Sequence, residues 1–340
     1  MNTTMGSLWG IVLAGGDGLR LKEFVREHTG TEAPKQFCAL IGTRTMLERT
    51  VRRARLLIPS ERLVVVGTAH HRRYMFQSFG KKPPGSVLFQ PLNRDTAPGI
   101  LFPLVHILRR DPYALVAIFP SDHFVLPGRR LMRAVGEATD FLVRTRSDSP
   151  IVLAVEPTSP EVEYGWMKLG PSILSDGPTS ICHVDRFVEK PSEEAADVML
   201  QDGWLWNTMV FVSRAASLME LFREAVPDLV AYFEMLQRYV GDAQEHEIAN
   251  EVYRMIPTVN FAATVLARQF SRLLVLPTTH VQWSDWGKKE RILQAMFDLG
   301  QRRYPSVAAA RAGLVFSTSA RDIENSIDRN RSWPSLSASA

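Results

Sequence analysis

The sequence has 340 residues, 45% of them hydrophobic and 22% charged, a balance typical of a soluble globular protein with one large domain or two smaller ones. The net charge is only +4, and no run of Lys and Arg with interleaved aromatic residues occurs, so nucleic acid is not expected as a partner. No apolar run approaches the ~18 residues of a spanning helix. The N-terminus also lacks a signal-peptide pattern, so no membrane partner is expected.

The chain opens with a buried strand that runs into a glycine-rich loop. The apolar run over 8–14 is interrupted only by Gly10 and leads into the loop over 15–18. Glycines after a strand expose backbone N–H groups, which can hold a phosphate or a nucleobase at close range. Arg20 and Lys35 would add two cations to this region if Thr29–Ala33 folds back.

Strands and helices alternate after this loop, which predicts βαβ units and a mostly parallel sheet. Buried strands are predicted at 63–66, 87–89, 115–119 and 151–155, and helices at 44–58, 96–109 and 131–143. The second half follows the same pattern more loosely. Its predicted strands are 184–188, 209–212, 273–276 and 280–283, and its predicted helices are 193–200, 218–226, 229–240 and 288–299.

The two cysteines, Cys38 and Cys182, are far apart and have no metal-binding spacing. We therefore expect reduced, buried thiols and a cytoplasmic protein, with a structural disulfide as the alternative.

Two aspartates are candidates for a metal site. Asp122 follows the predicted strand 115–119, and ligands of open parallel sheets bind outside the carboxyl ends of strands. It would therefore face the same crevice as the glycine loop. Asp285, in Trp283-Ser284-Asp285-Trp286-Gly287, could meet it across one Mg²⁺. A turn or a helix N-cap is the alternative role for each aspartate.

A second group of polar residues follows the predicted strand 184–188. Lys190 could place an ammonium on a substrate phosphate, and Glu189 a carboxylate on sugar hydroxyls, although a surface ion pair is the alternative. Together with the crevice, these residues fit nucleotidyl transfer to a sugar phosphate. The acceptor is already an anionic oxygen, so the chemistry needs positioning and charge stabilisation rather than a general base.

The chain resembles the sugar-1-phosphate nucleotidyltransferases, and among them the mannose-1-phosphate guanylyltransferases. The resemblance runs from about Leu8 to Leu299 and rests on motifs in the same order. They are Leu13-Ala14-Gly15-Gly16-Asp17-Gly18-Leu19-Arg20, Pro34-Lys35-Gln36-Phe37, Asn93-Arg94-Asp95-Thr96-Ala97-Pro98, Pro120-Ser121-Asp122-His123, Glu163-Tyr164-Gly165, Phe187-Val188-Glu189-Lys190-Pro191, Trp206-Asn207 and Trp283-Ser284-Asp285-Trp286-Gly287.

The resemblance implies an α/β fold with a Rossmann-like, mixed but mostly parallel sheet flanked by helices. It implies a nucleotidyltransferase domain over 1–299, whose first half binds nucleotide and whose second half binds sugar phosphate. Residues 300–340 would form a short C-terminal extension, disordered at its end. The implied reaction is GTP plus mannose 1-phosphate giving GDP-mannose and pyrophosphate, with Mg²⁺ as cofactor.

The resemblance also implies residue roles. Leu13, Ala14, Gly15, Gly16, Gly18, Arg94 and Thr96 would bind the nucleotide, and Arg20, Lys35, Asp122 and Lys190 would be catalytic. Tyr164, Gly165, Glu189, Lys190 and Asn207 would bind the sugar phosphate, and Asp122 and Asp285 would hold Mg²⁺.

Several positions depart from the family pattern. Leu19 replaces Thr, Asp95 replaces Asn, Glu163 replaces Gly, Met209 replaces Gly, and Asn260 stands where Asp is usual. The last three bear on the sugar side, so another pair of nucleoside triphosphate and hexose 1-phosphate is an open alternative. A non-catalytic, nucleotide-sugar-binding regulatory paralogue is another, and a homodimer is left open. A dinucleotide-dependent oxidoreductase is disfavoured because Leu21 stands at the third glycine position of that motif.

Overall fold

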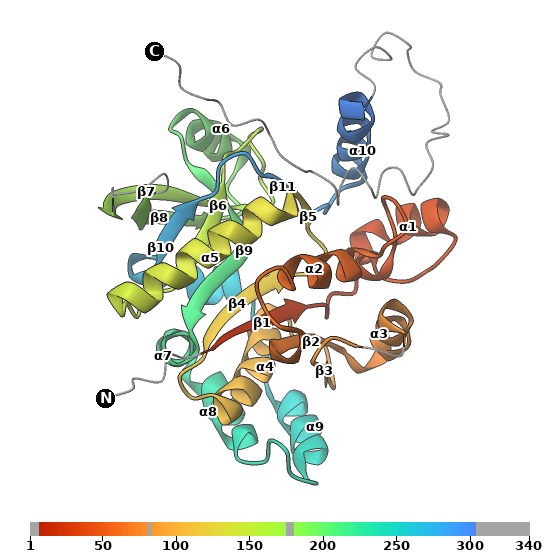
Figure 1. Ribbon diagram of the computed structural model, residues 1–340, viewed down its shortest axis with the longest axis vertical. Coiled ribbons are helices and arrows are strands. Elements are labelled where there is room, and N and C mark those ends of the chain that lie inside the picture. The colour runs from red at the N-terminus through yellow and green to blue at the C-terminus, as the bar shows by residue number, and fades with distance from the viewer. Residues whose placement is uncertain (1–6, 81–82, 175–179, 304–340) are drawn as a thin grey trace.

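A computed structural model describes residues 7–80, 83–174 and 180–303 (Figure 1). Within them, a nine-stranded sheet has the order β3-β2-β1-β4-β9-β6-β10-β8-β7. Its strands are β1 (Leu8–Leu13), β2 (Leu63–Thr68), β3 (Ser86–Gln90), β4 (Leu115–Pro120), β6 (Ile151–Val155), β7 (Gly165–Leu174), β8 (Ile181–Glu189), β9 (Leu205–Arg214) and β10 (Leu274–Pro277). β8 and β9 run antiparallel to the remaining strands. The predicted mixed, mostly parallel α/β sheet is therefore confirmed.

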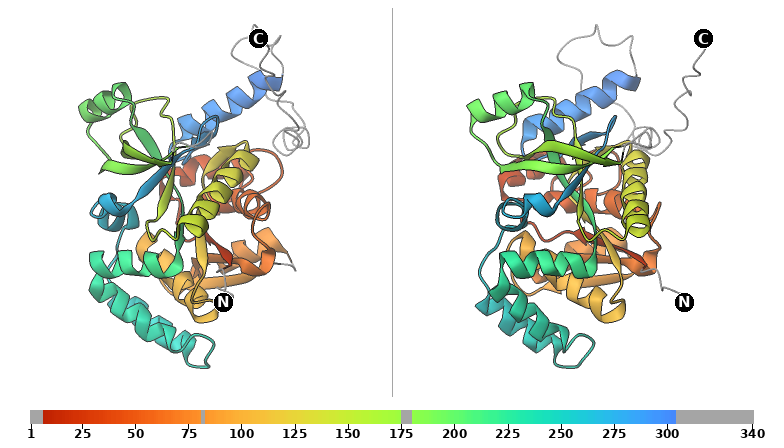
Figure 2. Two further views of the ribbon diagram at one scale, coloured as in Figure 1. Left: turned by 60° about the vertical axis from the view of Figure 1, so that its left-hand side comes forward. Right: turned by 90° about the vertical axis from the view of Figure 1, so that its left-hand side faces the viewer.

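Helices cover both faces of the sheet (Figure 2). One core contains buried residues from α1 (Lys22–Thr29), α2 (Met46–Ala54), α3 (Arg72–Phe79), α5 (Gly128–Thr145) and α6 (Glu193–Gln201). The other contains residues from α4 (Thr96–Arg110), α7 (Ala215–Ala225), α8 (Pro227–Gln237) and α9 (Glu245–Met255). Burial on both faces explains the nearly continuous apolar strands β1, β2 and β4.

A small second sheet brings the segment before α10 close to the end of β4. In it β11 (Gln282–Ser284) pairs antiparallel with β5 (Phe124–Leu126), and Trp283 lies opposite Val125. Because β5 follows Asp122 and β11 precedes Asp285, this pairing fixes the two aspartates near one another. Helix α10 (Lys289–Arg303) then projects from the end of the molecule opposite α8 and α9 (Figure 2).

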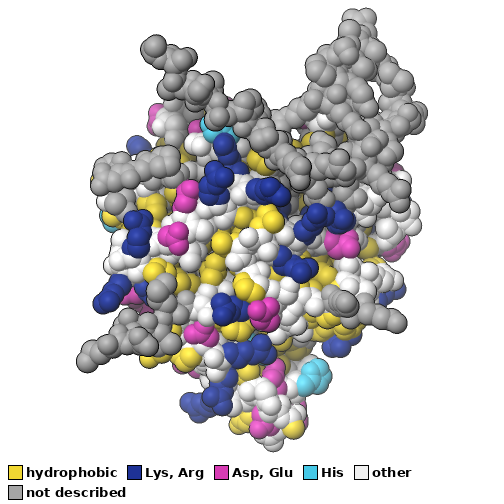
Figure 3. All heavy atoms as spheres, viewed as in Figure 1, with side chains coloured by type: hydrophobic (Ala, Val, Ile, Leu, Met, Phe, Trp, Pro, Cys, Tyr) yellow, Lys and Arg dark blue, Asp and Glu magenta, His cyan; other side chains and the backbone are white. Residues whose placement is uncertain are grey.

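The sequence missed α1, α3, α9, β5 and β7. The predicted C-terminal extension over 300–340 begins within α10, and its remainder, including the predicted disorder, lies outside the described residues. Cys38 and Cys182 are free, buried thiols, as predicted. Among the described helices none is long and apolar enough to cross a bilayer. On the face that carries α2 and α5, basic side chains are interspersed with apolar and acidic ones (Figure 3).

Candidate active site

The glycine loop after β1 is held by the segment that the sequence placed beside it. Gly18 has a left-handed backbone (φ 63°), and a Cβ there would lie 3.3 Å from the main-chain nitrogen of Lys35. The Gln36 side chain donates hydrogen bonds to the carbonyl oxygens of Gly16 (2.7 Å) and Ala14 (3.3 Å). Residues 29–33 therefore do fold back, and Gln36 holds the loop in place through these two hydrogen bonds.

A cleft of about 520 Å³ opens beside this loop. Six predicted residues line it, and they come from β1, the glycine loop, the end of β4 and the start of α4: Leu13, Ala14, Gly15, Gly16, Thr96 and Asp122. Gln36, Gln90 and Met209 also line the cleft. The carboxyl ends of the parallel strands thus face a common space, as the rule for open sheets requires.

Lys35 is almost fully buried and joins three chain segments. Its ammonium lies 3.1 Å from a carboxylate oxygen of Asp122 and donates to the main-chain oxygens of Trp286 (3.1 Å) and Asp285. These contacts account for all three N–H donors of a lysine. Lys35 therefore connects its own loop to the end of β4 and to the turn after β11. This contact lies next to the glycine loop, which is predicted to bind a phosphate.

The Lys35 ammonium also sets the charge of the two aspartates. Burial alone would raise the pKa of the Asp122 carboxyl, but Lys35 and His123 hold it below its ordinary value. The same balance of burial against Lys35, His123 and Arg291 lowers the pKa of Asp285. Both groups are therefore carboxylates at neutral pH, and Asp285 lies close enough to affect the titration of Asp122.

The Asp285 carboxylate is oriented by a set of donors around its Oδ1 atom. Tyr164 donates its hydroxyl at 3.0 Å, Arg291 its guanidinium at 2.6 Å and Gly287 its N–H at 2.8 Å. A Cβ at Gly287 would lie 2.7 Å from Asp285 Oδ2, so glycine is needed for this orientation. Burial, together with the charge of Asp285, raises the pKa of Tyr164, which remains a hydroxyl donor.

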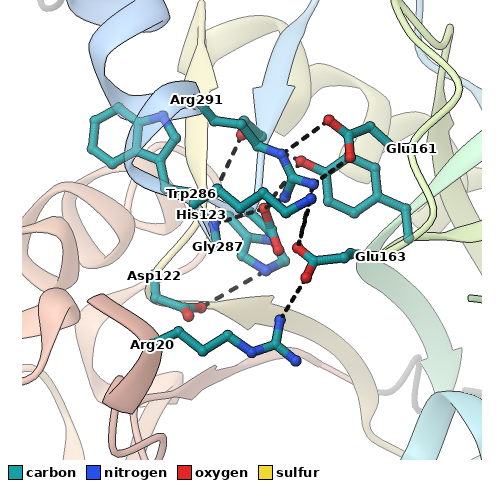
Figure 4. Close-up of polar contacts among 12 residues, drawn as sticks. Arg20, Asp122, His123, Glu161, Glu163, Trp286, Gly287 and Arg291 are labelled. Carbon is teal, nitrogen blue, oxygen red and sulfur yellow. Dashed lines mark hydrogen bonds and ion pairs between the residues drawn. The ribbon is translucent and has the colours of Figure 1, made fainter. Parts of the chain in front are cut away.

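Arg20 and Arg291 converge on one carboxylate (Figure 4). Glu163 accepts a hydrogen bond from Arg20 at 3.2 Å through one oxygen, and its other oxygen lies 3.4 Å from Arg291 and 3.8 Å from Lys288. Arg291 also makes a two-point ion pair with Glu161. Glu163, one of the departures from the family pattern, thus links the glycine-loop side of the site to α10.

The predicted sugar-side residues are brought together at the ends of β7, β8 and β9. A Cβ at Gly165 would meet Glu189 Oε2 at 2.6 Å and the Asn207 Cβ at 3.3 Å. Burial raises the pKa of the Glu189 carboxyl, partly offset by Lys190. Lys190 has a positive φ of 51° and donates its main-chain N–H to the Tyr164 carbonyl. The amide of Asn207 is buried and contacts Met209, which also lines the cleft.

Arg94 has partners away from the cleft. Its guanidinium donates to the carbonyl oxygens of Tyr253 (2.9 Å) and Arg254 (3.4 Å), near the end of α9. It is not among the cleft-lining residues of the described chain, and neither are Gly18, Arg20 and Lys35. Their predicted roles toward a nucleotide remain predictions.

Two departures from the family pattern are partners of one another. Asp95 caps α4 by accepting a hydrogen bond from the Thr96 N–H at 2.6 Å, and it has a positive φ of 67°. The Asn260 amide lies 3.4 Å from both Asp95 oxygens. The two departures therefore complement one another in this chain, because the contact pairs one carboxylate with one amide.

Sequence reasoning did not assign site roles to Gln36, Glu161 and Arg291. Gln36 belongs to the Pro-Lys-Gln-Phe motif and could have been found there. The pairing of Arg291 with Glu161 joins positions 130 residues apart, and neither residue has a local pattern that signals it.

The fold and the cleft are typical of a nucleotide-binding transferase, and comparison with known proteins supports this class. The sequence model of the family described as "Nucleotidyl transferase" matches residues 9–302, and this chain belongs to that family. A crystal structure described as mannose-1-phosphate geranyltransferase from Thermus thermophilus superposes with a TM-score of 0.70 at 28% identity, covering 84% of this chain and 79% of that one. UDP-glucose pyrophosphorylase, at 15% identity and a TM-score of 0.53, over 88% of this chain and 100% of that one, shares the fold.

Among named relatives, the chain is 27% identical to the alginate biosynthesis protein AlgA of Pseudomonas syringae pv. tomato over 82% of its own length and 56% of that protein. It is 27% identical to a mannose-1-phosphate guanylyltransferase of Salmonella muenchen over 83% of its length and 58% of that protein. The chain thus spans little more than half the length of these relatives.

Proposed function

We propose that this protein transfers a nucleotidyl group from a nucleoside triphosphate to a sugar 1-phosphate, with GTP and mannose 1-phosphate as its pair. The observation that carries the proposal is the meeting of the glycine loop, the buried Lys35 and the two ionised aspartates at one edge of the sheet. The mannose and guanine assignments rest on the relatives' names and on the sequence motifs.

In the proposed reaction, a phosphate oxygen of the sugar 1-phosphate attacks the α-phosphorus of the triphosphate. The bond from that phosphorus to the β-phosphate oxygen breaks, and pyrophosphate leaves. The glycine loop would position the triphosphate through its N–H groups, and Arg20 and Lys190 would offset the charge of the two anions. The reaction needs no general base, because the attacking phosphate oxygen is already ionised.

The donor set on the catalytic side suits a hard divalent cation. Asp122 and Asp285 supply carboxylate oxygens, which Mg²⁺ prefers, and among the described residues Asp285 Oδ2 takes part in no hydrogen bond. Asp122 and Asp285 would hold Mg²⁺, which when bound neutralises charge on the phosphates. Lys35 would keep both acids ionised and in place.

A different sugar is the second candidate, and a specific observation favours it. Met209 stands where the family has Gly, has a positive φ of 57°, and combines contact with Asn207 and a position in the cleft wall. A methionine side chain there reduces the room beside the predicted sugar-binding amide. Hexose 1-phosphates that differ from mannose around the ring would then compete for the site.

The test is pyrophosphate release across four nucleoside triphosphates and several hexose 1-phosphates in the presence of Mg²⁺. The proposal expects the highest kcat/KM with GTP and mannose 1-phosphate, and loss of release in Asp122→Asn. If another pair of triphosphate and sugar phosphate gave the highest kcat/KM, the proposed nucleotidyl transfer would stand and the proposed substrates would be wrong. If the protein bound a nucleotide sugar but released pyrophosphate with no substrate pair, it would be a regulatory paralogue, and the catalytic proposal would be refuted.

A further inference from the structure

Three metal-ligating side chains meet where the glycine loop passes the end of β2, apart from the pair Asp122 and Asp285. Asp17 lies in the glycine loop, and His70 and His71 form the short 3-10 turn after β2. One ligand atom from each of the three side chains lies within 4.8 Å of the other two. Neither the predicted roles nor the proposed reaction uses these three side chains.

The two distances from the histidines to Asp17 are close to those between ligands of one ion. His70 Nε2 lies 2.8 Å from Asp17 Oδ1, and His71 Nε2 lies 3.3 Å from the same oxygen. Zinc binds imidazole nitrogen and carboxylate oxygen at about 2.0–2.1 Å, so two of its ligands are about 2.9 Å apart at a right angle and about 3.4 Å apart at a tetrahedral angle. Both observed separations fall near this range, so small shifts would admit an ion.

Two neighbouring side chains, Thr68 and Asn93, orient the ligands of this cluster. His71 is buried, and its Nδ1 atom lies 2.8 Å from the hydroxyl of the buried Thr68. A hydrogen bond from Nδ1–H to this hydroxyl leaves the lone pair of Nε2 directed at Asp17, the arrangement that usually fixes a metal-binding histidine. Asn93 donates to the second oxygen of Asp17 at 2.9 Å, so Oδ1 remains on the histidine side.

We propose that Asp17, His70 and His71 bind a first-row transition metal ion of the zinc type. Two imidazoles with one carboxylate favour such an ion over Mg²⁺, which prefers oxygen ligands. Three protein ligands leave at least one position for water or for an anionic oxygen. Because Asp17 also lines the cleft, this ion would lie at the edge of the predicted nucleotide site. The proposal concerns metal binding alone and does not depend on the proposed reaction.

The experiment uses the untagged full chain after removal of metals with a chelator. Co²⁺ is titrated in the presence of excess Mg²⁺, and visible absorption follows its coordination. We expect one equivalent of Co²⁺ to bind with d–d bands of a nitrogen-containing site, and Zn²⁺ to displace it. His70→Ala and Asp17→Asn should each weaken binding at least ~10-fold, since each removes a direct ligand.

Two controls make the result specific. His183→Ala removes an exposed histidine on β8, and Asp122→Asn alters the predicted Mg²⁺ site; both should bind Co²⁺ like the wild type. His70 is itself largely exposed, so its removal should leave the circular dichroism spectrum unchanged. Absence of a Co²⁺ band, an unchanged titration in His70→Ala, or an equal loss in His183→Ala would overturn the proposal.

Discussion

Replacing Lys35 with Met would test whether this lysine organises the catalytic side. Methionine keeps the length of the buried chain but removes three donors, to Asp122 and to the carbonyls of Asp285 and Trp286. Breaking a buried ion pair costs about 3–5 kcal/mol. Because the Asp122 side chain is 36% exposed, solvent screening reduces the expected loss in free energy of unfolding to about 2–3 kcal/mol.

Urea denaturation at pH 7 measures this loss, with Lys190→Met as the matched control. Lys190 is exposed, so its replacement should change the free energy of unfolding by less than about 0.5 kcal/mol. A double-mutant cycle with Asp122→Asn should give a coupling energy of about 1–2 kcal/mol. A Lys35→Met protein as stable as Lys190→Met, or a coupling energy near zero, would refute the reasoning.

Three further predictions concern charge. Asp122→Asn should lower kcat by at least ~100-fold because it removes a preorganised charge; an unchanged pyrophosphate-release rate would contradict this. Glu163→Gln frees Arg20 from a partly exposed ion pair worth up to about 1 kcal/mol, so the KM for the triphosphate should fall by up to ~5-fold, and a higher KM would argue against a phosphate role for Arg20. Burial lowers the pKa of His71 to about 4, against about 6.5 when unfolded. His71 therefore binds more protons in the unfolded chain between these values, and its contribution should lower the free energy of unfolding of metal-free protein by about 2.5 kcal/mol from pH 6.5 to pH 4. Urea titrations over this range should show a flatter profile for His71→Asn.

Much of the first half of the sheet could be predicted because β1, β2 and β4 are buried on both faces. Runs such as Leu63–Val66 have no polar residue, and helices with clear apolar faces separate them. β7 could not be predicted in the same way, since Gly165, Gly170 and Pro171 are unfavourable in a strand. Pairing with β8 and β9 outweighs that local preference, and such pairing is not visible in a single sequence.

The candidate site also contains residues that the sequence could predict and contacts that it could not. Asp122 follows from a simple rule about strand ends, and Lys35 and Asp285 follow from motifs. The sequence could not reveal which groups the side chains of Lys35 and Arg20 contact. Lys35 contacts a main-chain oxygen 250 residues away, and Arg20 contacts Glu163 across 143 residues. The first contact depends on the turn after β11 lying beside Lys35, and in the second Glu163 is also held by Arg291 of α10.

The contact between Asp95 and Asn260 makes the start of α4 dependent on a segment far along the chain. An aspartate at position 260 would bring a second carboxylate about as close as the present 3.4 Å contact, and its repulsion from Asp95 would disfavour the cap. Anyone who grafts one of these two segments onto another protein of the family should therefore transfer both positions together.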